Sequence, residues 1–147
     1  MKRTALLVSL FLLCAPAFGH AVIRHFDYTI VFGGCFNHDI VSLKINNTVV
    51  FDRYEVDNAS AERRGNLSLT QTDEGIKIYY NGGEKTMRKV PVDHHMDVEV
   101  TINKEVSRFQ VDLRKGKVVL LDHCSGAPAL TARPVSVEQL HEPVIFM

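Results

Sequence analysis

The stretch MDVEVTINKEVSRFQVDL, from Met96 to Leu113, decides the fold. Apolar and polar residues alternate from Met96 to Ile102, which is the period of a β-strand with one buried face. Asn103 and Lys104 interrupt this alternation, and a second apolar and polar run follows to Leu113. Two such runs joined by a short polar turn predict an antiparallel β-hairpin.

The same pattern recurs on both sides of this hairpin, and no long segment has a helical period. Turn-forming residues, such as Asn46-Asn47 and Asn81-Gly82-Gly83, separate the runs. About eight or nine short strands with frequent turns predict an all-β, antiparallel β-sandwich, Ig-like or jelly-roll-like. Further strands are expected over 26–32, 41–45, 49–51, 67–70, 76–80, 86–92 and 117–122.

The first residues have the layout of a secretory signal peptide. A positive start at Lys2 and Arg3 precedes an apolar run over 5–14, which is shorter than the about 20 residues that span a membrane. Small residues around Gly19 predict a signal peptide over 1–19, with competing cleavage sites after Ala17 and Ala21. The protein is therefore expected to be secreted or periplasmic.

The remaining residues, 20–147, are expected to form a single β-sandwich domain. Its tail over 126–147 is expected to be partly irregular because Ser125-Gly126-Ala127-Pro128 is followed by two more prolines. The tail segment 135–140 is compatible with a short helix or a strand. The apolar end over 144–147 is expected to pack as an edge strand, because leaving it in water would be unfavourable.

Composition excludes several classes of protein. The chain has 147 residues, is 46% hydrophobic and carries 17 basic against 17 acidic side chains, which is typical of one globular domain. Without a marked basic excess, a general nucleic-acid partner is not expected. No later apolar run is long enough for a membrane helix, so no transmembrane segment is expected after signal cleavage.

Two cysteines remain once Cys14 leaves with the signal peptide. Cys35 and Cys124 form an even pair in an oxidising compartment, which predicts a disulfide between them. Neither belongs to a CxxC motif, so a thioredoxin-like redox function is not expected.

The predicted disulfide suggests a metal site nearby. His123 precedes Cys124 and His38 follows Cys35 by three residues, so the bridge brings the two imidazoles into one neighbourhood. Aspartates lie next to both, and imidazole with carboxylate suits zinc or copper. The alternative is that His38 and His123 are surface or capping residues.

The sequence has two further histidine features that bear on metal binding. His94 and His95 are adjacent, and neighbours on a strand face opposite sides, so they chelate one ion together only if they lie in a loop. His20, if cleavage exposes it, offers an α-amine and an imidazole to copper. This resembles the copper brace of lytic polysaccharide monooxygenases and of CopC-like copper carriers, which are also secreted β-sandwiches. The resemblance covers His20 and the fold class.

No motif of a hydrolase, metalloprotease, P-loop or dinucleotide-binding enzyme is present. The sequence therefore favours a secreted or periplasmic, non-enzymatic binding module of the cell envelope, with a protein or glycan partner and no required cofactor. Its binding surfaces are expected at the loop 57–66 and at the sheet end near His38 and His123. The alternatives are a copper- or zinc-binding protein that uses His20 or His38 and His123, and a secreted inhibitor of a hydrolase.

Overall fold

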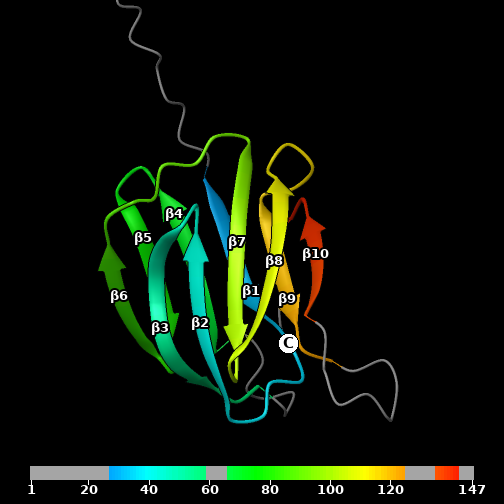
Figure 1. The fold of residues 1–147 in the computed structure, drawn as a ribbon. Helices are drawn as coiled ribbons and strands as arrows, with labels where there is room; N and C mark the ends of the chain where they lie inside the picture. Colours follow the sequence, from blue (N-terminus) through cyan, green and yellow to red (C-terminus); the bar gives the residue numbers. More distant parts are fainter. Residues whose placement is uncertain (1–26, 59–65, 125–134, 143–147) are drawn as a thin grey trace, which may run out of the picture.

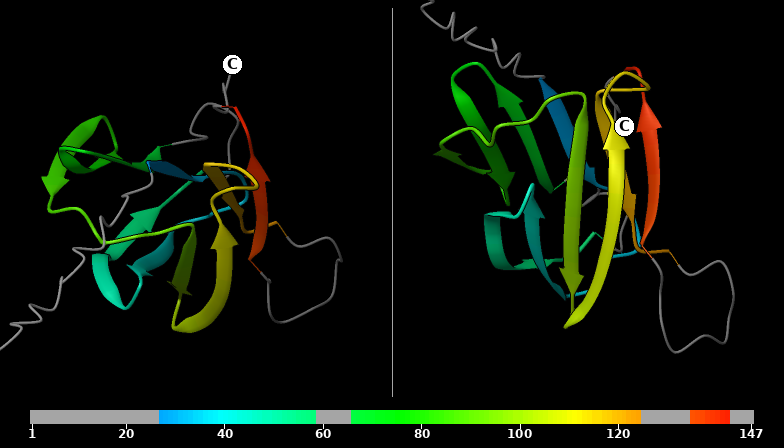
Figure 2. Two further views of the ribbon diagram at one scale, coloured as in Figure 1. Left: turned by 90° about the horizontal axis from the view of Figure 1, so that it is seen from above. Right: turned by 45° about the horizontal axis from the view of Figure 1, so that its top comes forward.

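The computed structural model describes residues 27–58, 66–124 and 135–142. These residues form two β-sheets that pack face to face as a sandwich (Figures 1 and 2). The six-stranded sheet has the order β10-β9-β1-β4-β5-β6, and the four-stranded sheet has the order β3-β2-β7-β8. The strands are β1 (Tyr28–Phe32), β2 (Asp39–Ile45), β3 (Thr48–Val56), β4 (Leu67–Thr72), β5 (Gly75–Tyr80), β6 (Gly83–Met87), β7 (His95–Ile102), β8 (Glu105–Asp112), β9 (Val118–Asp122) and β10 (Ser136–Leu140).

The described part of the chain contains no helix that is long and apolar enough to cross a membrane. The predicted signal peptide over 1–19, His20 and the apolar end over 144–147 lie outside the described residues.

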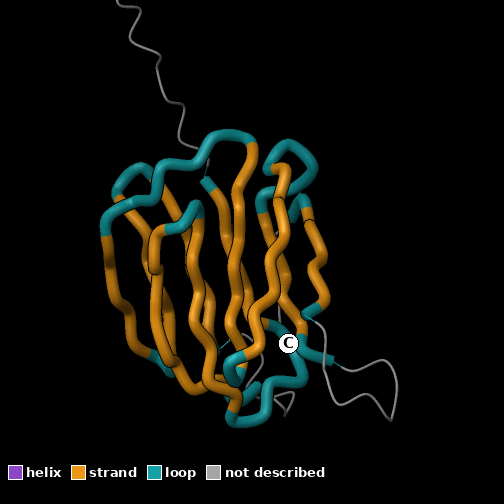
Figure 3. Tube along the Cα trace, in the orientation of Figure 1, coloured by secondary structure: helices purple, strands orange, loops and turns teal. Residues whose placement is uncertain are grey.

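The predicted β-sandwich is confirmed, and so is its deciding hairpin. β7 and β8 pair from His95 opposite Asp112 to Ile102 opposite Glu105. The turn residues Asn103 and Lys104 have positive φ angles of 49° and 80°, as a tight hairpin turn requires. Within the described residues, four pairs of neighbouring strands are joined by two-residue turns, and the turns lie at the two ends of the sandwich (Figure 3).

Three details differ from the sequence-based expectation. The described residues form ten strands rather than eight or nine, and the additional strand is β10 (Ser136–Leu140), within the tail segment that was compatible with a helix or a strand. The strand expected over 86–92 is instead β6, which pairs from Gly83 opposite Tyr80 to Met87 opposite Ile76. The pairing ends at Ile76, one residue after the start of β5 at Gly75. The third difference is that β1 and β9 pair in parallel, so the sheets are not purely antiparallel.

The core lies between the two sheets. Every second residue of the central strands is buried, including Leu43 and Val100 of one sheet and Leu69 and Ile78 of the other. Burial of each such side chain stabilises the fold by about 1.5–3 kcal/mol. The alternation that buries these residues also sends their neighbours to the outer faces of the sandwich.

The disulfide between Cys35 and Cys124 is confirmed, and it joins residues 89 positions apart. It lies just beyond the paired strands β1 and β9, where the Gly33 N–H donates to the Leu121 carbonyl at 2.8 Å. A Cβ at Gly33 would collide with the carboxylate of Asp122 and would crowd Leu120. That carboxylate accepts the N–H of Gly34 at 2.6 Å.

Two asparagines extend the pairing of β2 with β7 at both ends. The N–H of Asn46 donates to the Asp97 carbonyl and its Oδ1 accepts the Asp97 N–H, both at 2.9 Å. At the other end, the N–H of Asn103 donates to the Ile40 carbonyl and Oδ1 of Asn103 accepts the Ile40 N–H, both at 2.9 Å. Each asparagine side chain thus substitutes for a peptide group and holds the four-stranded sheet in register.

Candidate functional site

The outer face of the four-stranded sheet carries a ladder of polar side chains. Because Val98 and Val100 are buried, Asp97 and Glu99 lie on the opposite face of β7. Their partners on β8 also face outward, since Val111 is buried. From one end to the other, the outward pairs of β7 and β8 are His95 with Asp112, Asp97 with Gln110, Glu99 with Arg108, and Thr101 with Val106.

Glu99 is the centre of an ion-pair chain across three strands. It accepts hydrogen bonds from Nζ of Lys44 on β2 at 2.8 Å and from Nε of Arg108 on β8 at 2.7 Å. These two hydrogen bonds lower the pKa of Glu99 below its usual value, and the hydrogen bond from Lys44 has the larger effect. The carboxylate is therefore ionised at neutral pH and keeps both cationic side chains in place.

Two hollows lie on this outer face. The larger has a volume of about 590 Å³, and its lining includes Lys44, Asn46, Asn47, Asp97, Glu99 and Arg108. The smaller has a volume of about 460 Å³, and its lining includes Ser42, Asp52, Arg53, Thr101, Asn103 and Lys104. They are adjacent because Lys44 and Ser42, and likewise Glu99 and Thr101, are successive outward residues of the same strands.

The side chains around the smaller hollow are also held in place. The Ser42 hydroxyl donates to Oδ1 of Asp52 at 2.6 Å and accepts the N–H of Arg53 at 3.0 Å. Arg53 has a positive φ of 58° where the pairing of β2 and β3 is irregular. The irregularity and the serine together set the positions of Asp52 and Arg53 at the rim.

The predicted metal site at His38 and His123 lies at the disulfide end of the sandwich, and each of the two histidines has its own contacts there. Nδ1 of His38 lies 2.7 Å from Oε1 of Glu55, and its side chain is 67% exposed. His123 is buried, with Nδ1 3.2 Å from Oδ2 of Asp39 and its ring packed on Phe36. Nε2 of His38 also lies 3.8 Å from Oδ2 of Asp57, so the two imidazoles face different carboxylates. A shared zinc or copper ion at this end stays a prediction.

The Asp39 carboxylate is hydrogen-bonded to several segments at this end of the sandwich. It accepts hydrogen bonds from the Asn37 N–H at 3.0 Å and from Nδ2 of Asn103 at 2.5 Å, in addition to its contact with His123. Asp39 and His123 are each 8% exposed at the side chain. The hydrogen-bonding capacity of this buried carboxylate is thus well used at the disulfide end.

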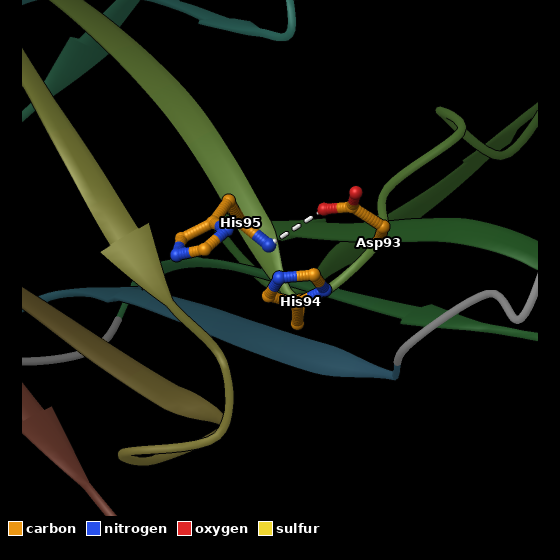
Figure 4. A group of neighbouring side chains, drawn as sticks. All are labelled: Asp93, His94 and His95. Atoms are coloured by element: carbon orange, nitrogen blue, oxygen red, sulfur yellow. Dashed lines mark hydrogen bonds between the residues drawn. The ribbon is translucent and has the colours of Figure 1, made fainter.

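Asp93, His94 and His95 form a group that could hold a metal ion (Figure 4). One potential ligand atom of each residue lies within 4.8 Å of the others. Within the described residues, at least three such ligands come together in this group. His94 lies in a bend before β7, so the rule that strand neighbours face opposite sides does not separate it from His95. Sequence reasoning considered the two histidines and missed Asp93, whose position two residues before His95 is typical of an Asx turn.

No protein-family model, curated protein or solved structure matches the chain. Because a β-sandwich hosts many unrelated functions, the function has to be argued from the residues of the sites themselves.

Proposed function

We propose that the chain is a secreted or periplasmic, non-enzymatic binding module of the cell envelope, and that it binds a glycan on the outer face of the four-stranded sheet. The observation that carries this proposal is the pair of adjacent hollows, of about 590 and 460 Å³, on one sheet face. Their total size suits two or more sugar residues of an extended chain. The Cys35–Cys124 disulfide is compatible with such a compartment.

The charge of the lining favours a neutral polyhydroxylated ligand. In the larger hollow Lys44 and Arg108 balance Asp97 and Glu99, so neither a strong anion nor a strong cation is preferred. Carboxylate, amide and guanidinium groups are good partners for hydroxyl groups.

The lining is also ordered before a ligand arrives. Glu99 is already hydrogen-bonded to Lys44 and Arg108, and Asp52 to Ser42. Side chains that are held in place lose little conformational freedom when a ligand binds, which favours affinity.

The test is binding of the full secreted chain to a panel of neutral and acidic oligosaccharides, measured on an array and then by calorimetry. Wild type is expected to bind a neutral member. Arg108→Ala and Glu99→Ala should each weaken binding at least about tenfold, which corresponds to about 1.4 kcal/mol. Lys85→Ala, an exposed substitution on β6 of the other sheet, is the matched control and should bind normally. Absence of binding to every glycan, or equal binding by the variants and wild type, contradicts the proposal.

The other functions remain predictions with their own tests. Copper or zinc bound through His20, or through His38 and His123, would be found by metal analysis of protein exported with its own signal peptide. A hydrolase that co-purifies with the chain would favour an inhibitor. A protein partner on the loop 57–66 would be lost when that loop is replaced.

A further inference from the structure

We propose that Asp93, His94 and His95 bind a divalent transition-metal ion of the zinc class at the end of the polar sheet face. The three residues each present one potential ligand atom, all within 4.8 Å of one another. This site is separate from His20, His38 and His123, and it does not depend on glycan binding.

The donor set selects the class of metal. Two imidazole nitrogens and one carboxylate oxygen suit Zn²⁺, and also Co²⁺, Ni²⁺ and Cu²⁺. Ca²⁺ and Mg²⁺ prefer sites built from oxygen atoms alone. A site with two imidazoles among three ligands therefore favours the transition metals.

The backbone already holds the three residues in place. Oδ1 of Asp93 accepts the His95 N–H at 2.7 Å, a hydrogen bond drawn in Figure 4. The His94 carbonyl accepts the Leu113 N–H at 2.8 Å, which fixes the bend against the chain that follows β8. His95 is the first residue of β7 and is paired with Asp112. Little ordering is therefore needed when an ion binds.

The site is open to solvent, and the carboxylate of Asp112 lies close to it. Asp93 is exposed, while His94 and His95 are partly exposed, so an ion can reach them. Oδ2 of Asp112 lies 4.0 Å from Nε2 of His95, and Arg114 holds that carboxylate through contacts of 2.8 Å. The 4.0 Å separation is too long for a hydrogen bond, so Asp112 favours a bound cation through its charge, which Arg114 partly offsets.

Three protein ligands leave at least one coordination position for water or for a group of another molecule. His95 and Asp97 are successive outward residues of β7, and Asp97 lines the larger hollow. The proposed ion thus lies at the rim of that hollow.

In the experiment, the full chain is first stripped of metal with a chelator and is then titrated with Zn²⁺ alone. Calorimetry measures the binding, and the melting temperature is compared with and without Zn²⁺. Wild type should bind one ion at this site and melt at a higher temperature with Zn²⁺, as a ligand of the folded state requires. His94→Ala and His95→Ala should each weaken binding at least tenfold, and Asp112→Asn should weaken it several-fold. Co²⁺ should give a visible absorption spectrum that His94→Ala abolishes.

Three controls locate the ion. His141→Ala, an exposed substitution after β10, should leave the affinity unchanged, and so should His38→Ala and His20→Ala. Circular dichroism of each variant confirms that it is folded. The proposal is overturned if stripped wild type does not bind Zn²⁺, or if folded His94→Ala and His95→Ala variants bind it as tightly as wild type. Loss of zinc binding in glycan-site variants such as Arg108→Ala is not expected, so this test and the glycan test fail independently.

Discussion

Asn103 adopts a left-handed backbone conformation and bonds through its side chain to both Ile40 and Asp39. We expect Asn103→Ala to lower the free energy of unfolding by about 2–3 kcal/mol, because a donor and an acceptor lose their partner and alanine is strained at positive φ. Urea denaturation measures this change. Asn47→Ala is the matched control, since Asn47 also has a positive φ, 65°, but is exposed in the turn. It should cost only about 1 kcal/mol. Equal losses in the two variants would mean that the side-chain bonds of Asn103 contribute nothing.

The contribution of Glu99 to the stability of the fold depends on pH, and the sign of this dependence follows from the lowered pKa of its carboxyl group. A carboxyl group with a lower pKa in the folded state stabilises the fold above the unfolded pKa of about 4.3, and this contribution disappears as the pH falls through the folded value. Glu99→Gln should therefore melt at a lower temperature than wild type at pH 7, and the difference should shrink towards pH 3. Calorimetric melting at low salt measures it.

Glu84→Gln is the control for this pH series, because Glu84 is exposed on β6, in the other sheet. Its melting temperature should follow that of wild type at every pH. A Glu99→Gln difference that is the same at pH 7 and pH 3 would contradict the ion-pair explanation, and so would a difference that high salt does not reduce.

At the scale of the element, the β7–β8 hairpin contains one unfavourable residue. Lys104 occupies the second turn position with a φ of 80°, where glycine is the preferred residue. We expect Lys104→Gly to stabilise the protein by about 0.5–1 kcal/mol, since the strain removed exceeds the extra flexibility of glycine in the unfolded chain. The midpoint of urea denaturation measures the effect. A lower midpoint would show that Lys104 makes a compensating contact along the smaller hollow.

Much at the element scale could be predicted from the sequence, since strands and hairpins depend on local period and turn residues. Alternation from Met96 to Ile102 was enough to predict β7 and its buried face. The displaced strand β6 shows the limit of such reasoning. β6 takes its position from its pairing with β5, which runs from Gly83 to Met87, and residues 88–92 lie outside that pairing.

At the scale of the whole molecule, the disulfide closes a loop with a sequence separation of 89 residues. The chain-entropy relation assigns such a loop roughly 4–5 kcal/mol, which is comparable to the total stability of a small domain. The double variant Cys35→Ser/Cys124→Ser should therefore have a free energy of unfolding lower than that of wild type by roughly 4–5 kcal/mol. Urea denaturation without reductant measures this difference. Wild type in reductant should behave in the same way. A variant as stable as oxidised wild type would show that pairing of β1 with β9 alone closes the sandwich.

The sequence by itself determined the all-β class, the central hairpin and the disulfide, because each follows from local periodicity or from the pairing of the two cysteines outside the predicted signal peptide. Only the tertiary structure decided the parallel pairing of β1 with β9 and the adjacent hollows on one sheet face. It also gave His38 and His123 separate carboxylate partners. The physical reason is that these features depend on strand register and side-chain direction. Both are set by packing between residues that are distant in the chain, and no local pattern encodes them.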